Sequence, residues 1–146
     1  MAFVPDISTA IAWALNESDR VADEARERPG DDQAFVPALW WFELRNALVI
    51  NERRGRITEQ QSGRFPPLPS PACGGGLGRG RLPIIVDTTM DENGVLSLAR
   101  RHRLTVYDAA YLELAIRSAL PLATLDALLA AAARSDGIPV FGDEGE

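Results

Sequence analysis

Four acidic residues stand in sequence contexts that suit metal-dependent chemistry: Asp6, Glu43, Asp108 and Asp126. Asp6 ends the apolar run AFVP, Asp108 follows LTVY, and Asp126 follows PLATL. Carboxylates that meet in one crevice repel one another and need a cation to hold them together. Oxygen ligands of this hard type suit Mg²⁺ or Mn²⁺. The pattern therefore predicts a divalent-metal site.

Each of these acids also has a plainer explanation. Asp108 and Asp126 each precede a helical pattern, where aspartate is a good N-cap. Glu43 can be read as a helix-surface glutamate in PALWWFELRNALVI. However, nearly all of its neighbours are apolar, and Asn46 lies one turn away on the same helix face. An acid beside an amide in such surroundings favours a polar pocket, since unpaired carboxylates are seldom buried.

Other polar and aromatic residues carry less information. The trio Arg53, Arg54 and Arg56 can contact phosphate or form a solvated helix end. His102, in RRHRL, is interpreted as an exposed helix-end residue. Trp40 and Trp41 are assigned to the core or to an interface rather than to base stacking.

The elements that must position the acids alternate along the chain. Short apolar runs predict strands at residues 3–5, 34–38, 82–87, 121–126 and 138–141, and a further short strand in LTVY, directly before Asp108. Apolar spacing and caps predict helices at residues 8–16, 39–53, 91–102, 107–119 and 127–137, with a charged helix and loop over 17–32. Ser8 or Thr9 is the expected cap of the first helix. Alternating strands and helices predict an α/β fold with a parallel sheet. In such sheets ligands bind at the carboxyl ends of the strands, where three of the acids are expected.

Composition narrows the function further. A chain of 146 residues, 46% of them hydrophobic, suits one domain. One cysteine excludes an internal disulfide and a cysteine-based zinc site. The net charge of −6 argues against a protein that binds nucleic acid through overall positive charge. It does not argue against an enzyme that binds phosphate through metal ions. All 15 basic residues are arginine, which removes lysine-dependent phosphate loops and Schiff-base chemistry. No signal peptide or membrane span is recognised, so a cytoplasmic protein is expected.

In their local sequences, the four acids resemble those of the PIN-domain ribonucleases, most closely the VapC toxins of bacterial toxin–antitoxin systems. The matching motifs are VPDIS, FELRNAL, LTVYDAAYLELA and PLATLDALLAAAA. The resemblance covers about residues 3–60 and 82–141. Pro5 and Ile7 depart from the residue types usual in the first motif.

The resemblance implies a single PIN domain over residues 1–146, built as a three-layer α/β/α sandwich around a mostly parallel sheet of four to five strands. It makes Asp6, Glu43, Asp108 and Asp126 the catalytic and metal-binding acids, with Asp6 and Asp108 the firmest ligands. Hydrogen bonds to the carboxylates or to metal-bound water would come from Ser8, Asn46 and Thr124. Weak RNA contacts are assigned to Arg53, Arg54 and Arg56.

The implied activity is hydrolysis of RNA phosphodiester bonds with Mg²⁺ or Mn²⁺. The implied partners are a VapB-type antitoxin and a second copy of the chain in a homodimer, with no membrane. The antitoxin is expected to cover the crevice and an apolar surface of the early helices, including an exposed Trp40 or Trp41. A catalytically impaired PIN-like module that binds RNA or protein is the alternative. A phosphoacceptor receiver is disfavoured, because that family relies on a lysine.

The segment RFPPLPSPACGGGLGRGRLP, residues 64–83, interrupts this pattern. The resemblance requires a helix here, begun by ITEQQSG with Thr58 as its cap. Of the 22 residues from Ser62 to Pro83, 5 are proline and 6 are glycine. Relative to alanine, each proline in a helix interior destabilises the helix by about 3 kcal/mol, and each glycine by about 1 kcal/mol. The glycines also lack the spacing and the lysine of phosphate loops. We expect an irregular loop over 62–82, far from the acids, and hypothesise a compensated frameshift in the gene or in its recorded sequence. Residues 142–146 are expected to be an acidic tail.

Overall fold

The computed structural model describes residues 2–15, 20–26, 33–63, 76–77 and 82–142 of the chain. Its strands are β1 (Ala2–Pro5), β2 (Gln33–Pro37), β3 (Gly76–Leu77), β4 (Leu82–Asp87) and β5 (Leu122–Ala123). Its helices are α1 (Ile7–Ala14), α2 (Arg20–Arg26), α3 (Trp40–Arg53), α4 (Glu59–Ser62), α5 (Glu92–His102), α6 (Val106–Ser118) and α7 (Ala127–Ser135).

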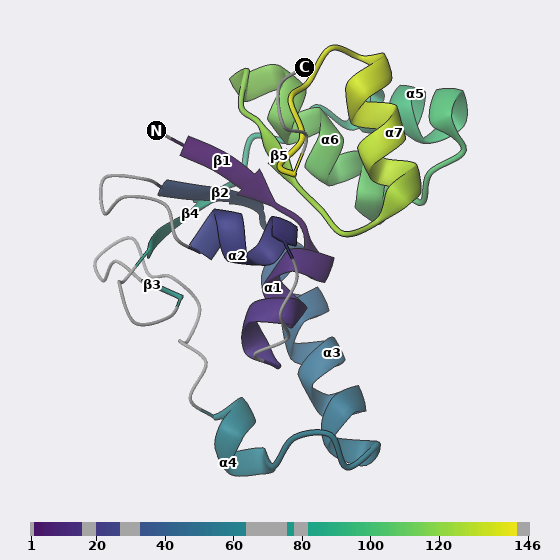
Figure 1. Cartoon of the computed structure of the whole chain (residues 1–146). Coiled ribbons are helices and arrows are strands. Elements are labelled where there is room, and N and C mark those ends of the chain that lie inside the picture. The colour runs from purple at the N-terminus through teal and green to yellow at the C-terminus, as the bar shows by residue number, and fades with distance from the viewer. Residues whose placement is uncertain (1, 16–19, 27–32, 64–75, 78–81, 143–146) are drawn as a thin grey trace.

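The strands form one sheet in the order β3-β4-β2-β1-β5. All neighbouring pairs are parallel except β3 with β4. The helices α1–α3 lie on one side of the sheet and α5–α7 on the other (Figure 1). The predicted α/β class with a mostly parallel sheet is therefore confirmed. The last expected strand is reduced to an isolated bridge between Val140 and Leu122.

The central strands are apolar along their length because helices cover both faces of the sheet. Phe3 and Val4 of β1 and Val36 of β2 are all fully buried. They belong to one hydrophobic core cluster, which also includes Leu112 of α6. Backbone pairing between β1 and β5 continues past the end of β1, where Asp6 N donates to the carbonyl of Ala123 at 3.0 Å.

Two sequence expectations about helix starts were wrong. Asp6, rather than Ser8 or Thr9, caps α1, because its carboxylate accepts from the backbone N–H of Thr9. In addition, the segment directly before Asp108 is not a strand. The β-branched residues that suggested one instead begin α6, with Thr105 as its N-cap accepting from Asp108 N at 3.1 Å.

The proline- and glycine-rich segment falls mostly outside the described residues. Thr58 caps α4 through a capping box with Gln61, as predicted. The irregular loop expected over 62–82 is wrong at Gly76–Leu77, which form the edge strand β3 by antiparallel pairing with β4, separated from β1 by β4 and β2. The predictions for residues 64–75, 78–81 and 143–146 lie outside the described part of the chain. No helix of the described residues has the length and apolarity to cross a membrane.

Candidate functional site

Each of the four predicted acids lies at the beginning of a helix. Asp6 caps α1, and Asp126 caps α7 by accepting from Leu129 N at 2.9 Å. Glu43 lies in the first turn of α3 and Asp108 in the first turn of α6. Capping is therefore a real role for two of the acids. It occupies only part of each carboxylate, so capping and ligand binding are compatible.

Asp6 is the most buried acid, with 1% of its surface exposed. Its carboxylate accepts from Ser8 Oγ at 2.6 Å, from Thr124 Oγ1 at 2.5 Å and from Thr9 N at 3.1 Å. Burial raises the pKa of Asp6 above its usual value, and the charge of Asp108 adds to the rise, against the three hydrogen bonds. The three hydrogen bonds thus fix the orientation of the Asp6 carboxylate, but they do not fully offset the cost of burying its negative charge.

Two hydroxyl groups join Asp6 to the turn that carries Asp126. Thr124 Oγ1 accepts from Asp126 N at 3.0 Å while it donates to Asp6. Ser8 Oγ similarly accepts from Leu125 N at 2.9 Å while it donates to Asp6. The geometry of residues 124–126 is therefore set by the Asp6 carboxylate.

Glu43 receives a hydrogen bond that the sequence reasoning missed. Tyr111 of α6 is fully buried, and its hydroxyl donates to Glu43 Oε1 at 2.8 Å. Burial raises the pKa of Glu43, the Tyr111 hydrogen bond opposes this, and the charges of Asp108 and Asp6 add to it. The spacing of Tyr111, three residues after Asp108 on one helix face, was the available signal.

Asp108 links the four acids electrostatically. Burial raises its pKa, and the negative charge of Asp126 raises it further. Asp108 in turn raises the pKa of both Asp6 and Glu43. The structure therefore places the four predicted acids close enough to interact electrostatically, beyond the carboxyl end of β1.

The chemistry of this crevice fits a divalent cation. Its acidic groups are carboxylates, the ligands that Mg²⁺ and Mn²⁺ prefer, and their mutual repulsion is of the kind that a cation offsets. Among the described residues, however, no three acidic, histidine or cysteine side chains form a ready-made ligand set for one ion. The residue types and charges fit the ion, whereas the described side chains form no closed ligand shell.

Other predicted site residues form no hydrogen bond with the four acids in the described part of the chain. Asn46 is exposed, and no hydrogen bond within the described part of the chain joins it to the four acids. Arg53, Arg54 and Arg56 are exposed at the far end of α3 (Figure 1). Arg53 follows Glu43 by ten residues, which places it about 15 Å away along the helix axis.

A shallow depression of about 290 Å³ opens beside Asp126. Thr124 and Asp126 form part of its wall, together with Arg20 of α2 and Arg134 of α7. The sequence reasoning did not select these two arginines, because they are far apart in the chain and belong to no motif. They place positive charge directly beside the acidic crevice.

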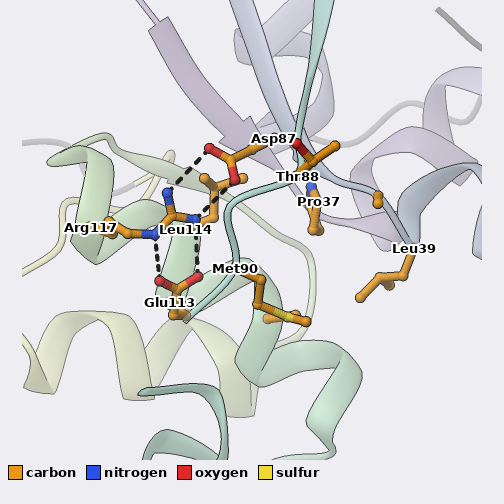
Figure 2. Close-up of a pocket in the computed structure, with 10 residues that line it drawn as sticks. Pro37, Leu39, Asp87, Thr88, Met90, Glu113, Leu114 and Arg117 are labelled. Atoms are coloured by element: carbon orange, nitrogen blue, oxygen red, sulfur yellow. Dashed lines mark hydrogen bonds and ion pairs between the residues drawn. The ribbon is translucent and has the colours of Figure 1, made fainter. Parts of the chain in front are cut away.

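A second cavity, of about 320 Å³, is separate from the acids, none of which lines it (Figure 2). Arg117 lies in its wall and donates five hydrogen bonds: to both oxygens of Glu113, both oxygens of Asp87, and Thr89 Oγ1. These bonds account for all five N–H groups of a guanidinium. The hydrogen bonds from Arg117 lower the pKa of Asp87. Arg117 is therefore a brace between α6 and the end of β4.

Solved structures of other proteins share this fold. The chain is similar to the crystal structure of PAE2754 from Pyrobaculum aerophilum, with TM-score 0.60, 22% identity, and coverage of 97% of this chain and 92% of that one. It also resembles a toxin–antitoxin complex from Klebsiella pneumoniae (TM-score 0.46, 18% identity, 82% of each chain) and FitAcB from Neisseria gonorrhoeae (TM-score 0.49, 18% identity, 97% of each chain). No protein-family model and no curated protein matches the chain. At these identities the similarity shows the fold alone, an α/β sandwich around a mostly parallel sheet.

Proposed function

We propose that this chain is a metal-dependent endoribonuclease and the toxin of a toxin–antitoxin pair. The observation that carries the proposal is the electrostatic coupling of Asp6, Glu43, Asp108 and Asp126, which lie at four separate helix starts. These are the positions at which the sequence resembles PIN-domain ribonucleases. The shared α/β sandwich supports the same assignment at the level of the fold.

The acids would hold Mg²⁺ or Mn²⁺, with Asp6 and Asp108 as the principal ligands. A bound divalent cation supplies Lewis-acid chemistry for phosphodiester hydrolysis. Ser8 and Thr124 keep the Asp6 carboxylate in one orientation through their hydrogen bonds of 2.6 and 2.5 Å. The proposal needs no nucleophilic side chain, and it agrees with the absence of lysine from the chain.

RNA would reach the crevice over a surface with local positive charge. Arg20 and Arg134 line the depression next to Asp126. Their charges would offset part of the repulsion between a phosphate chain and a protein of net charge −6. The trio Arg53, Arg54 and Arg56, farther along α3, would contact the strand away from the scissile bond.

The purified chain tests the proposal directly. We expect it to cleave generic single-stranded RNA in Mg²⁺ or Mn²⁺ and to stop when EDTA removes the ion. Asp108→Asn removes one charge at nearly constant shape, and should reduce the cleavage rate at least a hundredfold, since correctly placed metal ligands control the chemistry. Electrophoresis of end-labelled RNA gives the rate.

Asp91→Asn is the matched control, because Asp91 is exposed and makes no side-chain capping bond at the start of α5. This variant should cleave at the wild-type rate. Cleavage by folded Asp108→Asn at the wild-type rate would refute the assignment of the site. A wild-type protein that binds RNA without cleaving it in either ion would instead support the RNA-binding alternative.

A further inference from the structure

We propose that Tyr111 is a positioning residue, whose hydroxyl fixes the Glu43 carboxylate in the crevice and thereby sets how that carboxylate meets a divalent cation. The inference rests on the proposed function, because it assigns Glu43 to the metal site. It adds to the four acids a neutral residue from the interior of α6.

The contact joins two helices that are distant in sequence. Tyr111 lies in α6 and Glu43 in α3, 68 residues apart. The hydroxyl donates to Glu43 Oε1 at 2.8 Å, a good hydrogen-bond length for a charged acceptor. Tyr111 also lies one turn after Asp108 on the same helix. One face of α6 therefore presents an acid and, beside it, the donor that holds another acid.

Burial makes this contact specific. Tyr111 is 0% exposed, so its hydroxyl is out of reach of bulk solvent. A buried phenol is normally hydrogen-bonded, and Glu43 supplies the acceptor. Because the hydrogen bond engages Oε1, it limits rotation of the carboxylate. Groups that orient a metal ligand in this way typically change metal affinity by about 10–100-fold when they are removed.

The first experiment measures Mn²⁺ affinity by calorimetry in a double-mutant cycle. Tyr111→Phe removes a single oxygen atom and should weaken Mn²⁺ binding by about tenfold or more. In the Glu43→Ala background the same substitution should cause no further loss, since no carboxylate remains to be positioned. A purely structural tyrosine would cost the same in both backgrounds.

Tyr107→Phe is the matched control for this cycle. It removes the same atom from the same helix, but Tyr107 is 59% exposed. Mn²⁺ affinity should be unchanged in this variant. Thermal unfolding of each variant without metal checks that the fold is retained.

A second measurement keeps Tyr111 in place. The chain has two tyrosines, so 3-fluorotyrosine incorporated into the Tyr107→Phe protein labels Tyr111 alone. Its ¹⁹F resonance should shift on saturation with Mg²⁺, and Glu43→Ala should abolish that response. The result does not depend on cleavage activity or on the folding of Tyr111→Phe.

The outcomes separate the two proposals. Three results would each overturn the positioning role alone. These are wild-type Mn²⁺ affinity in Tyr111→Phe, an equal loss of affinity in both backgrounds, and a ¹⁹F resonance that does not shift with Mg²⁺. A wild-type chain that binds neither ion would overturn the proposed function, and this inference with it.

Discussion

At the scale of single residues, Asp108 is the acid whose replacement is easiest to interpret. It is half-buried and its charge raises the pKa of both Asp6 and Glu43. Asp6 and Asp126 also cap helices, so replacing them removes a structural hydrogen bond as well as a charge. The cap of α6 is Thr105. Asp108→Asn is therefore the cleanest probe of the electrostatics of the crevice.

We predict that the metal-free chain loses stability as the pH rises above about 4, the ordinary carboxyl range. Folding raises the pKa of Asp6, Glu43 and Asp108, mainly through burial. The folded state therefore binds more protons than the unfolded state, and the free energy of unfolding falls as these groups ionise. Urea unfolding in EDTA at pH 5 and pH 7 measures the loss.

Asp108→Asn should show a smaller loss over the same interval, because it lacks one of these groups and relieves two others. Asp87 and Asp136 have lowered pKa values and act in the opposite direction, but they are common to both proteins. Identical pH dependence in the two proteins would show that Asp108 is not electrostatically coupled to the crevice. Saturating Mg²⁺ should reduce the difference.

The candidate site residues that could be predicted from the sequence are those whose residue type and local context by themselves suggest a functional role. An aspartate after an apolar run, as at Asp6, is recognisable because charge is unusual at a buried strand end. Tyr111 was missed because a tyrosine among alanine and leucine is equally typical of a core helix. His102, expected to be exposed, is instead hydrogen-bonded to Asp136 at 2.8 Å, a contact across 34 residues that no local pattern encodes.

At the scale of elements, Arg117 connects α6 with the carboxyl end of β4 (Figure 2). We predict that Arg117→Met lowers the free energy of unfolding by about 1–3 kcal/mol, because Glu113 and Asp87 lose their cationic partner. Glu113 is 5% exposed and therefore poorly solvated without that partner. Urea unfolding measures the change, and Mn²⁺ affinity should stay at the wild-type value, since the four acids do not line this cavity.

Arg100→Met is the appropriate comparison, because Arg100 is an exposed arginine in the last turn of α5. It should change stability by less than about 0.5 kcal/mol. If the two variants were equally stable, the brace would contribute nothing to the fold. If Arg117→Met lost Mn²⁺ binding while remaining folded, the cavity and the crevice would be coupled.

Elements with one dominant signal were predictable from the sequence. The run LPIIVD predicted β4 at its observed bounds, Leu82–Asp87, because β-branched residues between polar ones leave few alternatives. The segment before Asp108 was not predictable in the same way. Thr105 is β-branched, which suggested a strand, but its hydroxyl also caps a helix, and tertiary packing selects the helix.

At the scale of the whole molecule, several apolar side chains are exposed. Phe42 is 68% and Leu128 71% exposed. Of the two tryptophans considered for the patch, Trp40 is 2% exposed and belongs to the core, whereas Trp41 is partly exposed. Phe42, two residues after Trp40 on α3, supplies exposed aromatic surface. Side-chain orientation on a helix follows from packing partners, which the sequence around WWF does not specify.

We predict that expression of this chain in a bacterial host slows growth, and that a small neighbouring gene relieves the effect. This follows from the proposed toxin role, with an antitoxin covering the crevice. Growth curves at matched expression levels provide the measurement. Asp108→Asn should be harmless at the same level, and Asp91→Asn as harmful as the wild type. Normal growth with abundant folded wild-type protein would contradict the toxin role.

The four helix starts at the crevice also have an electrostatic consequence for the order of binding. Each helix N-terminus carries about half a positive charge from its aligned peptide dipoles. The starts of α1, α3, α6 and α7 together offset about half of the charge of four carboxylates. The remainder, about two negative charges, is equal and opposite to the charge of one divalent cation. Under the proposed function, a phosphate chain would therefore be repelled until a divalent cation is bound, so the cation would bind before the RNA.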